Sequence, residues 1–167
     1  YKNEWQNNAD WLRLTFHAHS NKPDRPYEYA SPQKLIRDMD KVSGEICRFA
    51  GAETYTPPTI IHWGMTQPSA FKTLAKNGVR VLRGYFSRVE SGRWDVNYNL
   101  DDVRSEYLSR HDALKDFESG IVFGKVDMVC NNTGTDQIAP LLELVKKDNN
   151  RAEIMDLMTH EQYFWPF

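Results

Sequence analysis

The chain has 167 residues, of which 40% are hydrophobic and 26% charged, and it carries a formal net charge of −2. This length gives one domain with a hydrophobic core and is short for two domains. The balanced charge excludes nucleic acid as the main partner, and no apolar run reaches the roughly 20 residues that cross a bilayer.

The first part of the chain predicts a strand, a long helix and a second strand. Residues 11–17 alternate apolar and polar side chains with the period of a strand. Ser31 and Pro32 then begin a helix as its N-cap and its first helical residue, and Gly51 ends it. A short apolar run at residues 59–62 predicts the second strand.

The alternation of strands and helices continues to the end of the chain. The further predicted elements are a helix from Gln67-Pro68, a strand at 79–82, a short strand at 94–98, one or two helices within 103–117, a strand at 121–129, a helix at 138–145 and a strand at 154–159. Such alternation favours an α/β architecture with a mainly parallel sheet. We expect residues 1–167 to form a single domain.

Side chains that bind metals or transfer protons lie where these predicted strands end. The set is His17 and His19 after the first strand, His62 after the second, Asp127 in the strand at 121–129, and His160 after the last. In parallel α/β proteins, ligands bind beyond the carboxyl ends of the strands. Because alternate side chains of a strand share a face, His17 and His19 are expected to point the same way.

This combination of residues favours metal-assisted hydrolysis. Imidazole and carboxylate groups are common zinc ligands. A bound cation lowers the pKa of its water towards roughly 7, and a nearby histidine can protonate a leaving group. Structural interpretations remain open: His17 and His19 as a hydrogen-bonded pair at a loop edge, and His62 as a core histidine bonded to backbone. Asp127 could also cap a turn or form an ion pair with Lys125 or Arg151.

The order of elements resembles the polysaccharide deacetylase family, whose domain is a distorted (β/α) barrel. The position of the family's strand with a metal-binding histidine pair is taken by WLRLTFHAHS at residues 11–20. The position of its third motif is taken by IIHWG at residues 60–64, and its last motif, which ends in the general-acid histidine, resembles DLMTHEQYF at residues 156–164. Two stretches, FHAHSNKPDRPY and THEQYF, are similar to a bacterial subgroup of deacetylase-like proteins.

The resemblance implies a metal-dependent, carbohydrate-active hydrolase that removes acetyl groups from a polysaccharide or oligosaccharide. It implies a divalent metal, with zinc preferred, bound by His17 and His19, and His160 as the general acid. Asp127 is the candidate for the catalytic carboxylate. The residues expected to bind the glycan are His62, Trp63, Tyr85, Trp94 and Glu161.

The chain also departs from the family pattern. The histidines are spaced i and i+2 rather than i and i+4, the third motif lacks its arginine and proline, and the paired aspartates of the first motif are not present in residues 1–10. Five clear strands are predicted, whereas such barrels have seven or eight. We therefore expect a distorted or incomplete barrel that lacks its N-terminal strand, with its C-terminal boundary left open.

Two other functions remain open. The H-x-H-S pattern at residues 17–20 also resembles phosphoesterases of the polymerase-and-histidinol-phosphatase type and amidohydrolases, for which His62, Asp127 and His160 would supply further ligands. The missing aspartates favour a non-catalytic carbohydrate-binding domain. The sequence identifies neither the glycan nor the oligomeric state, and it leaves both a cytoplasmic and a secreted or periplasmic location open.

Overall fold

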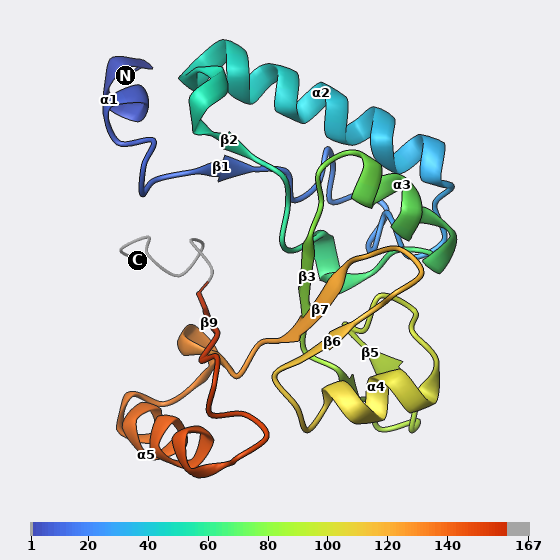
Figure 1. Cartoon of the computed structure of the whole chain (residues 1–167), viewed down its shortest axis with the longest axis vertical. Helices are drawn as coiled ribbons and strands as arrows, with labels where there is room; N and C mark the ends of the chain where they lie inside the picture. Colours follow the sequence, from blue (N-terminus) through green and yellow to red (C-terminus); the bar gives the residue numbers. More distant parts are fainter. Residues whose placement is uncertain (1, 160–167) are drawn as a thin grey trace.

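A computed structural model describes residues 2–159 of the chain (Figure 1). In chain order, its helices and strands are α1 (Lys2–Asn7), β1 (Leu14–Thr15), α2 (Pro32–Ala50), β2 (Tyr55–Thr56), α3 (Phe71–Lys76), β3 (Val81–Gly84), β4 (Ser87–Arg88), β5 (Trp94–Asp95), α4 (Asp102–Leu108), β6 (Ala113–Lys115), β7 (Val122–Lys125), β8 (Met128–Val129), α5 (Thr135–Lys147) and β9 (Leu157–Met158). The fold is therefore a mixture of helices and short strands.

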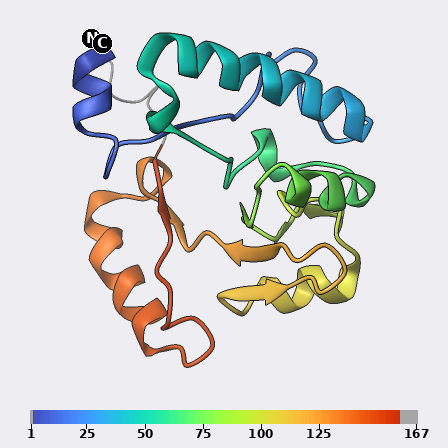
Figure 2. The same ribbon diagram turned by 45° about the horizontal axis from the view of Figure 1, so that its top comes forward.

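Most of these strands run parallel to their neighbours. The pairs β1–β2, β3–β7 and β8–β9 are parallel, whereas β6 runs antiparallel to β7 and β4 antiparallel to β5. Two backbone bonds extend the parallel series: His62 N donates to His17 O at 3.0 Å, and Arg83 N donates to Thr59 O at 2.6 Å. As a result β1, the segment after β2, β3, the β7–β8 segment and β9 follow one another across the molecule (Figures 1 and 2).

These pairings form four small sheets within residues 2–159, and they do not join into a closed ring. The predicted alternation of helices and strands is present, so the chain is mixed α/β. Two predicted elements differ. The strand predicted at 59–62 is not formed: β2 lies earlier, at Tyr55–Thr56, and His62–Gly64 forms a short helical turn. The stretch 103–117 contains α4 but also β6, because Ala113–Lys115 pairs with Val122–Lys125 instead of continuing the helix. The (β/α) barrel stays a prediction.

Helix α2 begins and ends where its capping residues predict. The Ser31 side chain accepts a hydrogen bond from Lys34 N at 3.2 Å, and the Gly51 N–H donates to Cys47 O. Such a cap satisfies a backbone donor that has no partner inside the helix. Leu35 and Met39 are buried on the helix's inner face, so α2 packs along the strands and closes one side of the core.

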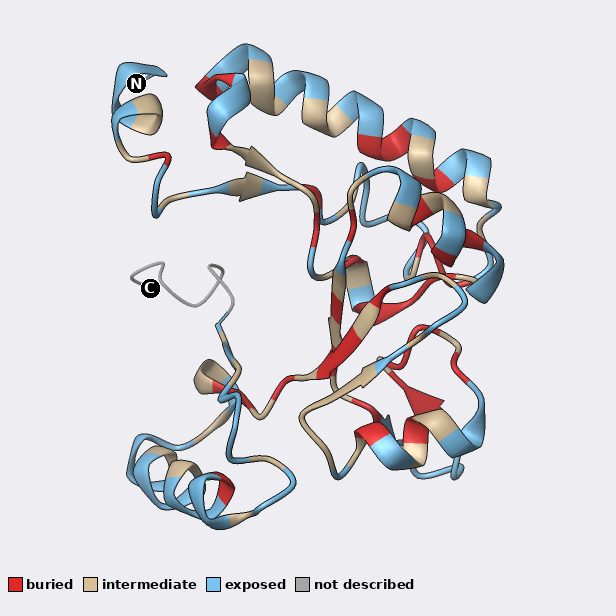
Figure 3. Cartoon of the chain, in the orientation of Figure 1, coloured by how far each residue is buried: buried red, intermediate tan, exposed pale blue. Residues whose placement is uncertain are grey.

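The hydrophobic core lies between α2, α3 and the β3–β7 pair (Figure 3). Its largest fully buried side chains include Phe16, Tyr27 and Phe123, and the rings of Phe71 and Phe123 meet edge to face with centroids 5.0 Å apart. In α5 only Val145 is buried. Among the described residues, none of the helices combines the length and hydrophobicity that a bilayer crossing requires.

Candidate functional site

One cavity of about 370 Å³ lies at the carboxyl ends of the parallel strands. Its walls come from the segments that follow β1 and β2, from the end of β3, and from the residues around β8 and β9. The lining residues are His17, Ile60, His62, Trp63, Gly64, Arg83, Gly84, Tyr85, Val96, Val126, Val129, Asn132 and Met158. This is the edge at which parallel α/β folds bind ligands.

Two histidines meet in this cavity. His17 Nε2 lies 3.0 Å from His62 Nδ1, and the two rings are nearly perpendicular with centroids 4.9 Å apart. The contact follows from the backbone, because His62 N donates to His17 O and so holds the two segments in register. One imidazole must donate an N–H to the lone pair of the other.

The spacing of this pair also suits a shared metal ion. Two nitrogen ligands of a tetrahedral zinc, each about 2.0–2.1 Å from the metal, lie roughly 3.3 Å apart. The observed 3.0 Å between His17 Nε2 and His62 Nδ1 is close to that separation. Within residues 2–159 there is no group of three or more His, Cys, Asp or Glu side chains arranged to hold a metal. The described residues therefore bring two nitrogen donors together, and a bound metal stays a prediction.

His19 lies away from this pair. Strand β1 ends at Thr15, so the alternation of a strand does not extend over residues 16–20, and His17 and His19 are not held on one face. His19 lines a separate groove beside α2, where Glu45 and Phe49 are its neighbours. The structure thus brings His17 together with His62, and it places His19, the second ligand expected from the sequence, in a different groove.

Asp127 is engaged in a structural ion pair. Its side chain is 1% exposed, and its two oxygens accept hydrogen bonds from the Arg151 guanidinium at 2.6 Å and from Asp156 N at 2.9 Å. The pairing with Arg151 that the sequence left open is confirmed. Burial raises the pKa of Asp156, although the Arg83 guanidinium 3.0 Å away opposes this effect. Asp127 is not among the residues that line the cavity.

The aromatic residues divide between two places. Trp63 and Tyr85 line the cavity, and burial raises the pKa of the Tyr85 hydroxyl. Trp94 is 7% exposed, lies in β5 under the Arg88 guanidinium, and borders a different surface groove that includes Tyr29. Of the predicted glycan-binding residues, His62, Trp63 and Tyr85 therefore line the cavity.

The remaining predicted site residues, His160 and Glu161, lie outside the described part of the chain. Two further cavity residues, Arg83 and Asn132, belong to no motif in the sequence. For Arg83, its place beside a predicted strand end is the one signal that could have found it. For Asn132, which follows β8 in a short turn, the sequence gives no signal.

Comparison with known proteins found no matching family model, no matching curated protein and no matching solved structure.

Proposed function

We propose that this protein is a divalent-metal-dependent hydrolase that acts on acylated glycans at the cavity lined by His17 and His62. The observation that supports the proposal most strongly is the 3.0 Å approach of two imidazole nitrogens from neighbouring parallel segments. Trp63 and Tyr85 line the same cavity. Ligand-type side chains beside aromatic rings, at the carboxyl ends of strands, are typical of enzyme sites.

In this proposal each cavity residue has a distinct role. His17 and His62 would hold the metal, whose binding would replace the proton that the two rings share in their hydrogen bond. A bound divalent ion supplies an activated water and polarises an acyl carbonyl. The Tyr85 hydroxyl is protonated at neutral pH, as a phenol ordinarily is, and burial raises its pKa further, so it can donate a hydrogen bond to the substrate. His160, the general acid in the deacetylase resemblance, keeps that role as a prediction.

The proposal is tested by the zinc content of the purified chain after loading with zinc and desalting. We expect about one zinc per chain in the wild type, loss of zinc in His17→Ala and His62→Ala, and retention in His19→Ala. His19 is a matched control because it is close in sequence but lines another groove. Zinc retained by His62→Ala but lost by His19→Ala would refute the assignment of the pair.

Activity is the second measurement. Release of acetate from acetylated oligosaccharides should require both His17 and His62 and should stop when the metal is chelated. Release of phosphate from simple phosphate esters, without acetate, would favour the phosphoesterase alternative instead.

A non-catalytic glycan-binding domain is the second candidate, and one observation favours it. Asp127, the carboxylate expected to take part in catalysis, is held by Arg151 and by the backbone of Asp156. This candidate predicts glycan binding that survives chelation and the substitution His17→Ala, with no acetate released.

A further inference from the structure

Trp63 has a backbone conformation that bulky residues rarely adopt. Its φ is 60° and its ψ is 13°, in the left-handed region, within the short turn His62–Gly64. Contact of the side chain with the backbone disfavours this region for L-residues other than glycine. The conformation persists only where the surroundings enforce it, and such positions cluster at ligand sites. Val96, which lines the same cavity, is also left-handed, with a φ of 50°.

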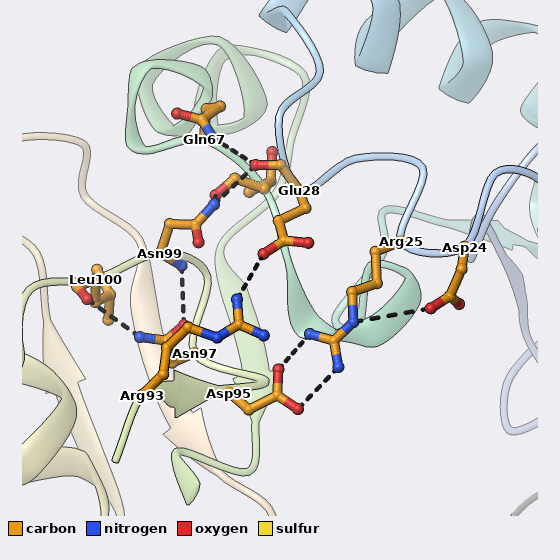
Figure 4. A network of polar contacts seen from close by, with 10 residues as sticks. Asp24, Arg25, Glu28, Gln67, Arg93, Asp95, Asn97, Asn99 and Leu100 are labelled. Carbon is orange, nitrogen blue, oxygen red and sulfur yellow. Dashed lines mark hydrogen bonds and ion pairs between the residues drawn. The ribbon is translucent and has the colours of Figure 1, made fainter. Parts of the chain in front are cut away.

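Three residues of other segments hold the Trp63 side chain in place. The indole Nε1 donates to Asp24 Oδ1 at 2.9 Å, and the Arg25 guanidinium lies over the ring, 4.8 Å from its centroid. Arg25 is itself fixed by two hydrogen bonds to Asp95, one of them 2.9 Å long (Figure 4). We call Asp24, Arg25 and Asp95 the indole bracket.

The Arg25–Asp95 pair of the bracket is largely buried, whereas Asp24 lies at the surface. The side chains of Arg25 and Asp95 are 19% and 11% exposed. The hydrogen bond from Arg25 lowers the pKa of Asp95, so the Asp95 carboxylate favours its charged form more strongly than an ordinary aspartate does. Bidentate pairing of a guanidinium with a carboxylate fixes the plane of the guanidinium as well as its position. The orientation of the guanidinium that lies over Trp63 is therefore set by Asp95 of β5 (Trp94–Asp95), which is distant in sequence.

The bracket leaves part of the Trp63 surface accessible. Although Arg25 lies over one face, Trp63 remains 42% exposed and lines the cavity. His62, Tyr85 and Asn132, which carry hydrogen-bonding groups, line the same cavity. A flat apolar surface in one cavity with such groups matches a pyranose ring, which has an apolar C–H face and a rim of hydroxyls.

We infer that the indole bracket fixes Trp63 as a platform on which the cavity stacks a sugar ring, and that Arg25 is a positioning residue for glycan recognition. The inference rests on the proposed function for its ligand class, a glycan. Arg25 acts through Trp63: its guanidinium covers the face of the indole that the sugar does not use.

The test is calorimetric titration with the tetramer of β-1,4-linked N-acetylglucosamine. We expect Arg25→Lys to weaken binding about tenfold, because the apparent affinity falls in proportion to the fraction of chains in which Trp63 has its binding-competent orientation. Lysine keeps the charge but loses the planar, bidentate contact. Trp63→Ala should abolish binding. Arg88→Lys is the matched control, since the Arg88 guanidinium lies over the Trp94 ring at 4.1 Å, away from the cavity.

A second variant tests the inference independently in case Arg25→Lys does not fold. The Asp24 side chain is 75% exposed, so Asp24→Ala removes the hydrogen bond to Trp63 without disturbing the core, and it should weaken binding about threefold. Arg25→Lys or Asp24→Ala chains that melt like the wild type but bind the tetramer less well support the inference. Equal binding by Arg25→Lys, Arg88→Lys and the wild type would overturn it, as would a wild type that does not bind about 1 mM tetramer.

Zinc content separates this inference from the proposed function. The bracket contributes no metal ligand, so Arg25→Lys should keep the zinc content of the wild type. A wild type that binds the tetramer in an Arg25-dependent way but takes up no zinc would support the platform and refute the hydrolase. A wild type that binds zinc through His17 and His62, and whose tetramer affinity is indifferent to Arg25, would refute the platform alone.

Discussion

Asp127 provides a prediction that separates a structural role from a catalytic one. Its carboxylate is almost completely buried and binds the Arg151 guanidinium and the backbone N–H of Asp156. These bonds tie the segment between β7 and β8 to the segment that leads into β9. We predict that Asp127→Ala destabilises the fold, because both donors lose their acceptor in a place that water reaches poorly.

The structure sets the size of the effect. Removing one partner of a buried ion pair costs about 3–5 kcal/mol, and a hydrogen bond to a charged group contributes about 1.5–3 kcal/mol. The Arg151 side chain is 22% exposed, so water recovers part of the loss. We therefore expect the free energy of unfolding to fall by about 3 kcal/mol. For a domain of this size, that corresponds to a decrease in Tm of roughly 6–12 °C.

Urea unfolding followed by tryptophan fluorescence measures this loss. The control is Glu118→Ala: Glu118 pairs with Lys72 at 2.7 Å, but the two side chains are 76% and 61% exposed, so the loss should stay below about 1 kcal/mol. A similarly small loss in Asp127→Ala would refute the reasoning. Acetate release abolished at unchanged stability would instead assign Asp127 to catalysis.

Three further predictions concern packing and pH. In Gly84→Ala the new Cβ would lie 2.5 Å from a backbone carbonyl oxygen, so the free energy of unfolding should fall by about 1–3 kcal/mol. In Gly44→Ala, within α2, no atom would lie within 4 Å of the new Cβ. The higher helix propensity of alanine should therefore raise the free energy of unfolding by about 1 kcal/mol in the same urea assay. The hydrogen bond from Arg25 lowers the pKa of Asp95, so its stabilisation is present above the ordinary carboxyl pKa and is lost as pH falls; unfolding of Asp95→Asn should depend less on pH in acid. Burial raises the pKa of Tyr27 to about 12. The contribution of Tyr27 to the free energy of unfolding is therefore complete below pH about 10 and is lost as the pH rises towards about 12. In Tyr27→Phe, the free energy of unfolding should not show this loss when it is measured across the same pH range.

The elements that the sequence predicts well are those whose signals are local. Helix α2 runs from Pro32 to Ala50, as Ser31 and Gly51 indicate, because caps and helical periodicity act within a few residues. The stretch 103–117 shows the opposite case. Its apolar spacing suggests helix throughout, but Ala113–Lys115 forms β6 because pairing with β7 outweighs local preference.

The same distinction explains the site. The sequence places His17 and His62 at strand ends, and the structure brings both into one cavity. Their direct contact depends on the register of Leu14 with Tyr55, which is set by hydrogen bonds between distant segments. His19 shows how much depends on where a strand stops, because the face that it occupies is undefined once β1 has ended.

Trp63 and Trp94 show why residue type alone does not identify a recognition surface. Each tryptophan has an arginine guanidinium over its ring, from Arg25 and Arg88 respectively, and both are expected from the sequence to bind sugar. Trp94 lies in a strand and is 7% exposed, whereas the left-handed turn at Trp63 directs its ring to the cavity and leaves it 42% exposed. The two pairs thus share an arginine–indole contact but differ in the backbone under the ring, in the exposure of the ring and in the acidic partner of the arginine, which is Asp95 for Arg25 and Glu106 for Arg88. Comparing Arg25→Lys with Arg88→Lys tests within one protein whether the same substitution affects glycan binding only at the pair that borders the cavity.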